Sequence, residues 1–174
     1  MLVDFNNPEK LAAQNGLVDY LKSQELDLSP FENSEIVKEG NVCGEVFAGN
    51  LSMFCTLIGT PWQEIFRDKI LVIEELFEVF FRIDRMMKQL RHSGILGVVK
   101  GVIIGSMDKM VDSSTPYGKS IKEIVLDNLK DFDGPIVWSA PSGHGKSNTP
   151  ISCSRELVFS TVDGIVKLLS LIHI

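Results

Sequence analysis

The sequence of 174 residues lacks any cluster of lysine and arginine, and its formal net charge is −6 with an isoelectric point near 5.1. Proteins that bind the phosphate backbone of nucleic acid carry a basic patch or stripe, so nucleic acid is excluded as an expected partner. Long apolar runs are also lacking: none reaches the ~18 residues of a membrane span, and the N-terminus has no signal-peptide pattern. We therefore expect a soluble, cytoplasmic protein.

Cysteine is scarce as well. The three thiols, Cys43, Cys55 and Cys153, are far apart and form no CxxC pair, which indicates neither a disulfide framework nor a zinc site. We expect buried, reduced thiols, no metal and no other cofactor. Hydrophobic residues make up 44% of the sequence and charged residues 23%, a composition that excludes a mainly disordered chain and suffices for one domain with a substantial core.

Three short apolar runs mark the centre of the sequence, and each is typical of a strand buried on both faces of a sheet. They are KILVIEEL from Lys69, GVIIG over 101–105 and PIVWSA over 135–140. Between them, apolar side chains recur at helical spacing from Phe80, with Gly94 as the C-cap, and again from Thr115. Strand–helix–strand order predicts parallel strands joined by right-handed crossovers. The pattern therefore indicates an α/β fold.

The N-terminal segment is predicted to lead into this sheet. Asn7 and Pro8 fit the N-cap and first position of a helix that runs to about Lys22. Its apolar side would carry Leu11, Val18 and Leu21. Residues 24–40 are polar and contain a proline, so they are predicted to form a connector.

Further short elements are predicted on either side of the three central runs. The stretch GEVFAGN predicts a strand and a turn at Gly49, followed by a helix from Leu51 to about Gly59. Near the other end, ELVFSTV and IVKLLSL flank Asp163-Gly164, a strong indication of a β-hairpin. The last ten residues, 165–174, are mostly apolar but too few to span a membrane. We expect an artificial or truncated end there, with a last core strand as the alternative.

The loop PSGHGKSNTP, residues 141–150, supports two interpretations. Residues 140–147 fit a relaxed phosphate-loop pattern, which would make the chain a nucleotide-binding protein. A phosphate loop requires a helix beginning near Lys146, yet residues 148–150 are Asn-Thr-Pro and no helical periodicity follows. The other interpretation is that two glycines present His144 as a catalytic imidazole.

His144 and Glu74 both follow predicted strand ends. Functional groups gather beyond the carboxyl ends of strands in an open parallel sheet, so we expect these side chains to lie within hydrogen-bond reach. A carboxylate that accepts from Nδ1–H fixes the imidazole tautomer and leaves Nε2 free to take a proton from a nucleophile. A histidine in a glycine-rich loop and paired glutamates at a strand end also occur as plain surface groups, and the residues alone leave that alternative open.

Four stretches resemble the LD-carboxypeptidase family in their order and spacing. They are GEVFAGNLSMFCTLIGTPW, ILVIEELFEVFFRIDRMMKQLRHSGIL, VKGVIIG and PSGHGKSN, within about residues 40–165. The resemblance implies a swivelling β/β/α domain, with a parallel core sheet flanked by helices and additional antiparallel β elements. It makes residues 41–174 the C-terminal domain, with the last ten in question, and residues 1–40 a lead-in helix and linker from a missing N-terminal domain.

The resemblance also implies site residues. The family's catalytic glutamate falls on Glu74 and its histidine on His144, as two members of a Ser-Glu-His triad. The family's asparagine beside the substrate falls on Asn50, although asparagine beside Gly49 is also a common turn residue. The sequence departs from the family pattern at positions that bear on substrate preference: Ala48, Leu76, Phe77 and Val79.

The family's nucleophilic serine has no counterpart here. No Gly-x-Ser-x-Gly elbow is present, and Ser52, Ser142 and Ser147 are not expected to follow a strand and open a helix. The resemblance therefore implies the C-terminal part of a cytoplasmic serine LD-carboxypeptidase of murein recycling, inactive alone. Its expected partners are a murein tetrapeptide or a peptide antibiotic and the missing nucleophile domain, and a homodimer is an open alternative. A non-catalytic swivelling module that binds a partner is the alternative from another class.

Overall fold

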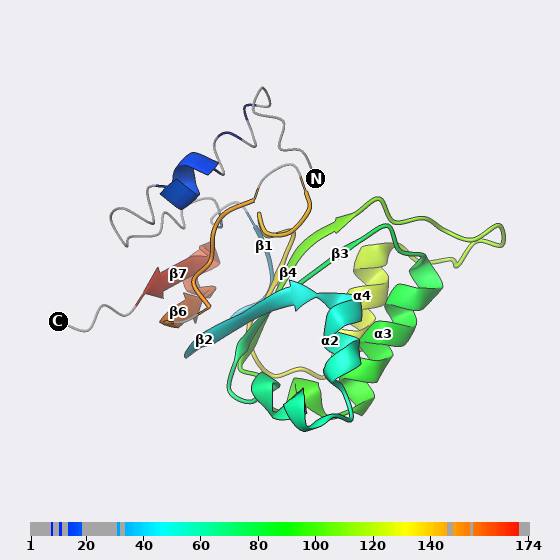
Figure 1. Ribbon diagram of the computed structural model, residues 1–174, viewed down its shortest axis with the longest axis horizontal. Helices are drawn as coiled ribbons and strands as arrows, with labels where there is room; N and C mark the ends of the chain where they lie inside the picture. The colour runs from blue at the N-terminus through cyan, green and yellow to red at the C-terminus, as the bar shows by residue number, and fades with distance from the viewer. Residues whose placement is uncertain are drawn as a thin grey trace.

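The computed structural model describes residues 8, 11, 14–18, 31, 34–145, 148–153 and 155–170 (Figure 1). The strands in this part of the chain are β1 (Glu35–Lys38), β2 (Asn41–Asn50), β3 (Ile70–Leu76), β4 (Gly101–Asp108), β5 (Ile136–Trp138), β6 (Glu156–Ser160) and β7 (Lys167–Ser170). The helices are α2 (Leu51–Leu57), α3 (Phe80–His92) and α4 (Ile121–Leu129), with short 3-10 helices η2 (Pro61–Phe66), η3 (Ile95–Gly97) and η4 (Val162–Gly164). These strands form one sheet in the order β1-β5-β4-β3-β2-β6-β7.

The centre of the sheet is parallel, which confirms the predicted α/β fold. Strands β2, β3, β4 and β5 run in one direction, and Ile73 of β3 lies opposite both Gly49 of β2 and Ile104 of β4. Strand β1 adds antiparallel to the edge of β5. Strands β6 and β7 form the predicted hairpin, and Asp163 at its turn has a left-handed φ of 63°.

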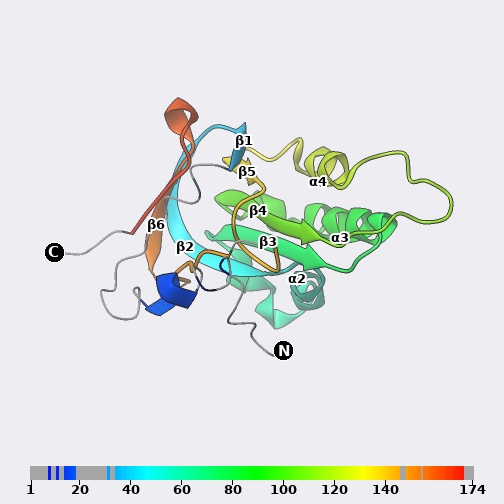
Figure 2. The ribbon, with the colours of Figure 1, turned by 90° about the horizontal axis from the view of Figure 1, so that it is seen from above.

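Strand β2 connects the parallel and antiparallel parts of the sheet. Its first half, residues 41–45, pairs antiparallel with β6, and its second half, residues 46–50, pairs parallel with β3. Figure 2 shows β2 as a long curved strand that carries the sheet round toward β6. The sheet thus has one face covered by helices and an opposite face against which the β6–β7 hairpin packs.

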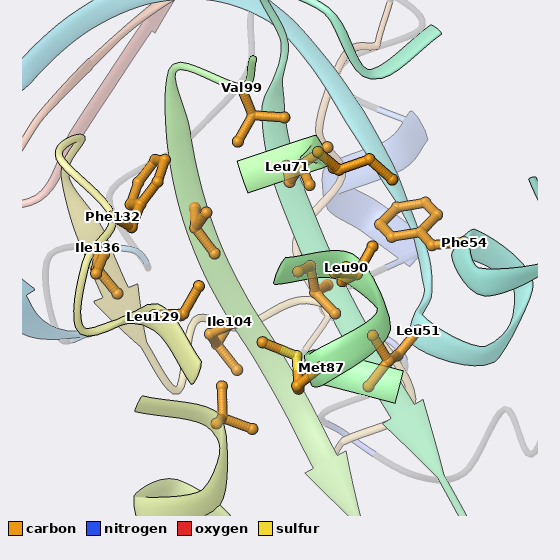
Figure 3. Close-up of a cluster of buried hydrophobic side chains, with 14 of the residues drawn as sticks. Leu51, Phe54, Leu71, Met87, Leu90, Val99, Ile104, Leu129, Phe132 and Ile136 are labelled. Atoms are coloured by element: carbon orange, nitrogen blue, oxygen red, sulfur yellow. The ribbon is translucent and has the colours of Figure 1, made fainter. Parts of the chain in front are cut away.

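Side chains along β3 alternate between two hydrophobic cores. Leu71 and Ile73 belong to the helix-side core, together with Met87 of α3 (Figure 3). Ile70 and Val72 pack in the opposite core, which includes side chains of β6 and β7. Each of these side chains is almost completely buried, and burying one of this size contributes about 1.5–3 kcal/mol. The two cores explain why this strand is a continuous apolar run.

Helix α4 begins later than the sequence pattern predicted, at Ile121 and not near Thr115. The carboxylate of Asp112 accepts backbone N–H groups from two later residues, which holds the preceding segment in a turn. The helix begins where Ser120 and Glu123 form a reciprocal capping box. The Ser-x-x-Glu pattern therefore marks the start of this helix, and the predicted start near Thr115 was wrong.

The connector predicted over residues 24–40 includes a strand. Strand β1 pairs with β5, with Glu35 opposite Trp138, and Glu35 also forms an ion pair with Lys122 of α4. Its four side chains alternate only between exposed and half-buried. Such a short, weakly apolar segment has no periodicity strong enough to predict a strand.

Only part of the predicted N-terminal helix lies within the described residues. Leu11 and residues 14–18 are helical, but Leu11 and Val18 are each 44% exposed, so the predicted apolar side is not buried here. Leu21 and the tail residues 171–174 lie outside the described residues. Among the helices that are described, none is long and apolar enough to cross a membrane.

The thiols are less buried than predicted. Cys43 and Cys55 are partly exposed and Cys153 is exposed, and all three are free. Cys153 lies in the irregular segment before β6. The prediction of three buried thiols was therefore wrong.

Candidate active site

Two adjacent glutamates lie near the end of β3 on opposite faces of the sheet. Because side chains alternate along a strand, Glu74 lies on the side of Val72 and Glu75 on the side of Ile73. Glu74 is 8% exposed and Glu75 is 3% exposed. Carboxylates at this depth need hydrogen-bond partners, and the two glutamates have different ones.

Glu74 is paired with His144 from the loop after β5. Its Oε2 lies 2.7 Å from His144 Nδ1, across 70 positions of sequence. Because the carboxylate accepts, Nδ1 carries the proton and Nε2 keeps a free lone pair. The Glu74 side chain is 11% exposed and the His144 side chain 46% exposed. The expected hydrogen bond is present, and it joins a buried carboxylate to an accessible imidazole.

The loop that carries His144 is fixed to strand β4 by backbone hydrogen bonds. The N–H of Ala140 donates to the carbonyl of Ile104 at 2.9 Å, and the N–H of Ser106 donates to the carbonyl of Ser142 at 2.8 Å. Strand β4 is the neighbour of β3 in the sheet. The two bonds therefore place the loop beside the carboxyl end of the strand that carries the glutamates.

Gly143 lies where a larger residue does not fit. Its φ of 111° is in the left-handed region, which favours glycine. A Cβ added here would lie 2.5 Å from Ser106 Oγ and 2.7 Å from Glu74 Cβ. The missing side chain lets the loop backbone approach the glutamate closely enough for the next residue, His144, to reach the carboxylate.

The phosphate-loop interpretation finds no support in the described residues. It requires a helix that begins near Lys146. Lys146 and Ser147 lie outside the described residues, and residues 148–153 form no helix. Without a following helix the loop lacks the positive helix end that binds phosphate.

Glu75, on the other face, supports the start of helix α2. Its Oε2 accepts the backbone N–H of Ser52 at 2.9 Å, and its Oε1 accepts Nδ2 of Asn50 at 2.5 Å. The Oδ1 of Asn50 in turn accepts the N–H of Ser52 at 3.0 Å, as an N-cap. Glu75 is thus held in a helix cap and makes no described contact with His144.

Asn50 lies opposite Glu74 in the pairing of β2 with β3, but its side chain is bonded to Glu75. The amide of Asn50 has two N–H groups, and the described contacts use one of them. Ser52 differs from expectation, because it lies in the first turn of α2, which begins directly after β2. Its hydroxyl donates to Asn50 Oδ1 at 2.6 Å.

Cys55 on helix α2 is not a nucleophile near neutral pH. Burial, and secondly the negative charge of Glu75, raise the pKa of the Cys55 thiol to about 11. The thiolate, which is the reactive form, is therefore scarce.

Sequence reasoning missed two β4 residues that shape this site. A Cβ added at Gly105 would lie 2.4 Å from the carbonyl oxygen of Ser142. The hydroxyl of Ser106 accepts the N–H of Gly145 at 3.0 Å. Gly105 and Ser106 directly follow the apolar run at the start of β4. A Gly-Ser pair in that place is the sequence signal that could have indicated these two residues.

Residues 43–157 match the family described as the LD-carboxypeptidase C-terminal domain. A protein of Synechocystis sp. named a carboxypeptidase is 35% identical over 136 residues, which are 77% of this chain and 45% of that protein. A protein of Bacillus subtilis named a murein peptide carboxypeptidase is 27% identical over 137 residues, 79% of this chain and 42% of that protein. The chain spans less than half the length of these curated relatives.

Two solved structures share the fold. The muramoyltetrapeptide carboxypeptidase from Oxalobacter formigenes has a TM-score of 0.70 at 24% identity, covering 88% of this chain and 54% of that one. The microcin C7 self-immunity protein MccF, in complex with glutamyl sulfamoyl guanosine, has a TM-score of 0.67 at 19% identity, covering 82% and 42%. At these identities the likeness concerns the fold alone.

Proposed function

We propose, from the premise that this chain belongs to the LD-carboxypeptidase family, that Glu74 and His144 are two members of a Ser-Glu-His triad. The third member is a serine of a domain outside residues 1–174. The complete enzyme hydrolyses the bond between an L-centre and a terminal D-amino acid in a murein tetrapeptide. The names of the Bacillus and Oxalobacter relatives, which refer to murein peptide and muramoyltetrapeptide, support this substrate class.

In the proposed reaction, Nε2 of His144 takes the proton of the serine hydroxyl as the serine oxygen attacks the substrate carbonyl. Glu74 accepts from Nδ1–H throughout and stabilises the imidazolium that forms. The imidazolium then gives its proton to the departing amine of the D-amino acid, which leaves an acyl-enzyme. Water hydrolyses that ester by the same proton transfers in reverse. The nucleophile domain supplies the oxyanion donors.

The observation that carries the proposal is the 2.7 Å contact between Glu74 Oε2 and His144 Nδ1. An ion pair exposed to solvent contributes little stability and does not hold a surface histidine in one position. The carboxylate that His144 contacts is instead almost buried. Here the loop glycine, the β4 contacts and the buried glutamate all favour one position of the imidazole. That is the preorganisation a general base requires.

Asn50 is proposed to bind the substrate with its remaining amide N–H. It lies at the carboxyl end of β2, opposite Glu74 in the sheet. Its contact with Glu75 holds the amide in a fixed orientation. We propose that the domain begins at β1 and not at the expected residue 41, because Glu35–Lys38 pair with β5 in the same sheet. The residues before β1 are then the proposed lead-in segment.

A binding module without catalysis is the second candidate, and one observation favours it. Phe77 is 67% exposed just beyond the glutamates, and the ammonium of Lys109 lies 4.6 Å from the centre of its ring. An exposed aromatic ring with a cation is a surface that could hold a peptide. This alternative predicts that a peptide binds and is not cleaved.

The test uses a chimaera in which the part of the Synechocystis relative outside the match precedes residues 34–174. Release of D-alanine from a murein tetrapeptide is measured for the chimaera and for the chain alone. We expect turnover by the chimaera and none above background by the chain. His144→Ala should lower kcat of the chimaera roughly 10⁴- to 10⁶-fold.

His92→Ala is the matched control, because His92 is an exposed histidine at the end of α3. It should leave kcat unchanged. Comparable turnover by the chain alone, or an equal loss in both histidine variants, would falsify the proposed triad. A peptide that binds the chimaera without being cleaved would favour the binding module.

A further inference from the structure

Strand β4 contains an irregularity directly beside Glu74. The pairing with β3 advances from Ile73–Ile104 to Glu75–Met107, so β4 gains one residue over β3 in this interval. Two residues of β4, Gly105 and Ser106, therefore lie opposite the single residue Glu74. An extra residue of this kind is a β-bulge, which is uncommon between parallel strands and re-aims side chains next to active sites.

The bulge presents both the backbone and the side chain of Ser106 to the loop of His144. The N–H of Ser106 donates to the carbonyl of Ser142 at 2.8 Å. Its Oγ accepts the N–H of Gly145 at 3.0 Å. One residue therefore contacts the loop two positions before His144 and one position after it.

Ser106 also packs close to the carboxylate partner of the histidine. The ideal Cβ position on Gly143 lies 2.5 Å from Ser106 Oγ and 2.7 Å from Glu74 Cβ. The backbone at Gly143 therefore lies close to both the hydroxyl and the glutamate, with no room for a side chain between them. Both Glu74 and His144 are thus positioned from the same point of β4.

We propose that Ser106 is a positioning residue, whose hydroxyl holds Gly145 and so keeps the His144 imidazole on Glu74. It does not touch the reacting atoms. The effect on turnover rests on the proposed function, whereas the effect on the imidazole does not. A catalytic group displaced by about 1 Å can lose about 100-fold in rate, and losing one of several anchors should cost part of that.

The test compares Ser106→Ala with Ser142→Ala. Both serines are half-buried, but the described contacts of Ser142 with β4 use its backbone, which alanine retains. NMR of the 174-residue chain follows the Nδ1–H resonance of His144 and the exchange rate of the Gly145 amide. In Ser106→Ala we expect the resonance to broaden or vanish and the Gly145 amide to exchange about tenfold faster. Ser142→Ala should change neither.

Turnover gives the second readout. In the active chimaera, Ser106→Ala should lower kcat about tenfold with KM changed less than twofold, because the base is displaced while the substrate contacts remain. Unchanged Nδ1–H and Gly145 signals in Ser106→Ala would overturn the proposal. If Ser106→Ala does not fold, the exchange rate of the Gly145 amide in the wild-type chain decides the proposal. Fast exchange with solvent would overturn the proposal, and slow exchange would support it. A chimaera without turnover counts against the triad, while the spectra still decide the role of Ser106.

Discussion

The two faces of the sheet use the same residue type for different purposes. Glu74 and Glu75 are adjacent, both nearly buried, and both near the end of β3. On the helix face, Glu75 is bonded to a helix N-terminus and its capping asparagine. On the other face, Glu74 has an imidazole that is still half exposed. The difference teaches that burial alone does not distinguish the proposed catalytic carboxylate, and that its bond to an accessible imidazole does.

The helix face shows the structural pattern again at Asp84. This carboxylate of α3 accepts from Lys88 on the same helix, from the hydroxyl of Tyr117, and from the amide of Asn128 on α4. It ties together α3, α4 and the loop before α4. As in the contact of Glu75 with the N–H of Ser52, the partners of Asp84 stabilise the fold.

Among variants that leave Glu74 and His144 unchanged, the largest effect on turnover is expected for Gly143→Ala. The new Cβ would meet Ser106 and Glu74 at contacts too short to tolerate, so the loop must shift and kcat of the chimaera should fall about 100-fold. Gly94→Ala is the control, since Gly94 has a φ of 82° and open space around its Cβ position. Both variants should lose about 1–2 kcal/mol of unfolding free energy through backbone strain. Equal turnover in the two would contradict the packing of the loop on Glu74.

A smaller effect concerns the charge of Glu75. Cys55 should react with iodoacetamide near neutral pH at least about 100-fold more slowly than the exposed Cys153, because burial and the Glu75 carboxylate raise the pKa of its thiol. Glu75→Gln should speed the reaction of Cys55, whereas Glu74→Gln should not. Mass spectrometry of the alkylated chain measures both. A response of Cys55 to Glu74→Gln would mean that the two faces are not electrostatically separate.

The smallest effect is expected at Asp84. Burial would raise the pKa of Asp84, but hydrogen bonds from Lys88, Tyr117 and Asn128 outweigh it and hold that pKa below the ordinary value of 3.8. A lowered folded-state pKa means that this stabilisation is complete above about pH 4 and is lost as the pH falls through the folded value. Asp84→Asn should lower the unfolding free energy at pH 7 by about 1–2 kcal/mol and flatten its decline below pH 4.

Urea unfolding between pH 2.5 and pH 7 measures this change in slope. The turnover of the chimaera should stay within about twofold of wild type in Asp84→Asn, since no described contact joins Asp84 to the glutamate–histidine pair. A selective loss of turnover would place Asp84 in the reaction and would undo the division between the faces.

Much of the fold could be predicted because its central strands, β3 and β4, are buried on both faces. The run ILVIEEL, GVIIG and the Asp163-Gly164 hairpin each carry a local pattern strong enough to define an element. The approach of His144 to a glutamate of β3 was expected from the rule that parallel strands end at the same edge, and the family resemblance assigned that glutamate to Glu74. The structure contains this hydrogen bond.

The remainder depends on neighbours that no local pattern describes. The bulge at Gly105 and Ser106 exists only relative to the register of β3. Strand β1 forms because β5 offers an edge. Helix α2 begins at Leu51, as the sequence predicted, but the hydrogen bond from its first turn to Glu75 of another strand could not be predicted.

The most direct measurement compares Glu74→Gln with Glu75→Gln in the chimaera, taking kcat for D-alanine release and the free energy of unfolding for each. Glu74→Gln should lower kcat roughly 10⁴-fold, because an amide does not stabilise the imidazolium, and should change unfolding by less than about 1 kcal/mol. Glu75→Gln should keep kcat within a few-fold and lose about 2 kcal/mol of stability. An equal loss of turnover in both variants, or full turnover in Glu74→Gln, would contradict the assignment of Glu74 and His144 as the catalytic pair.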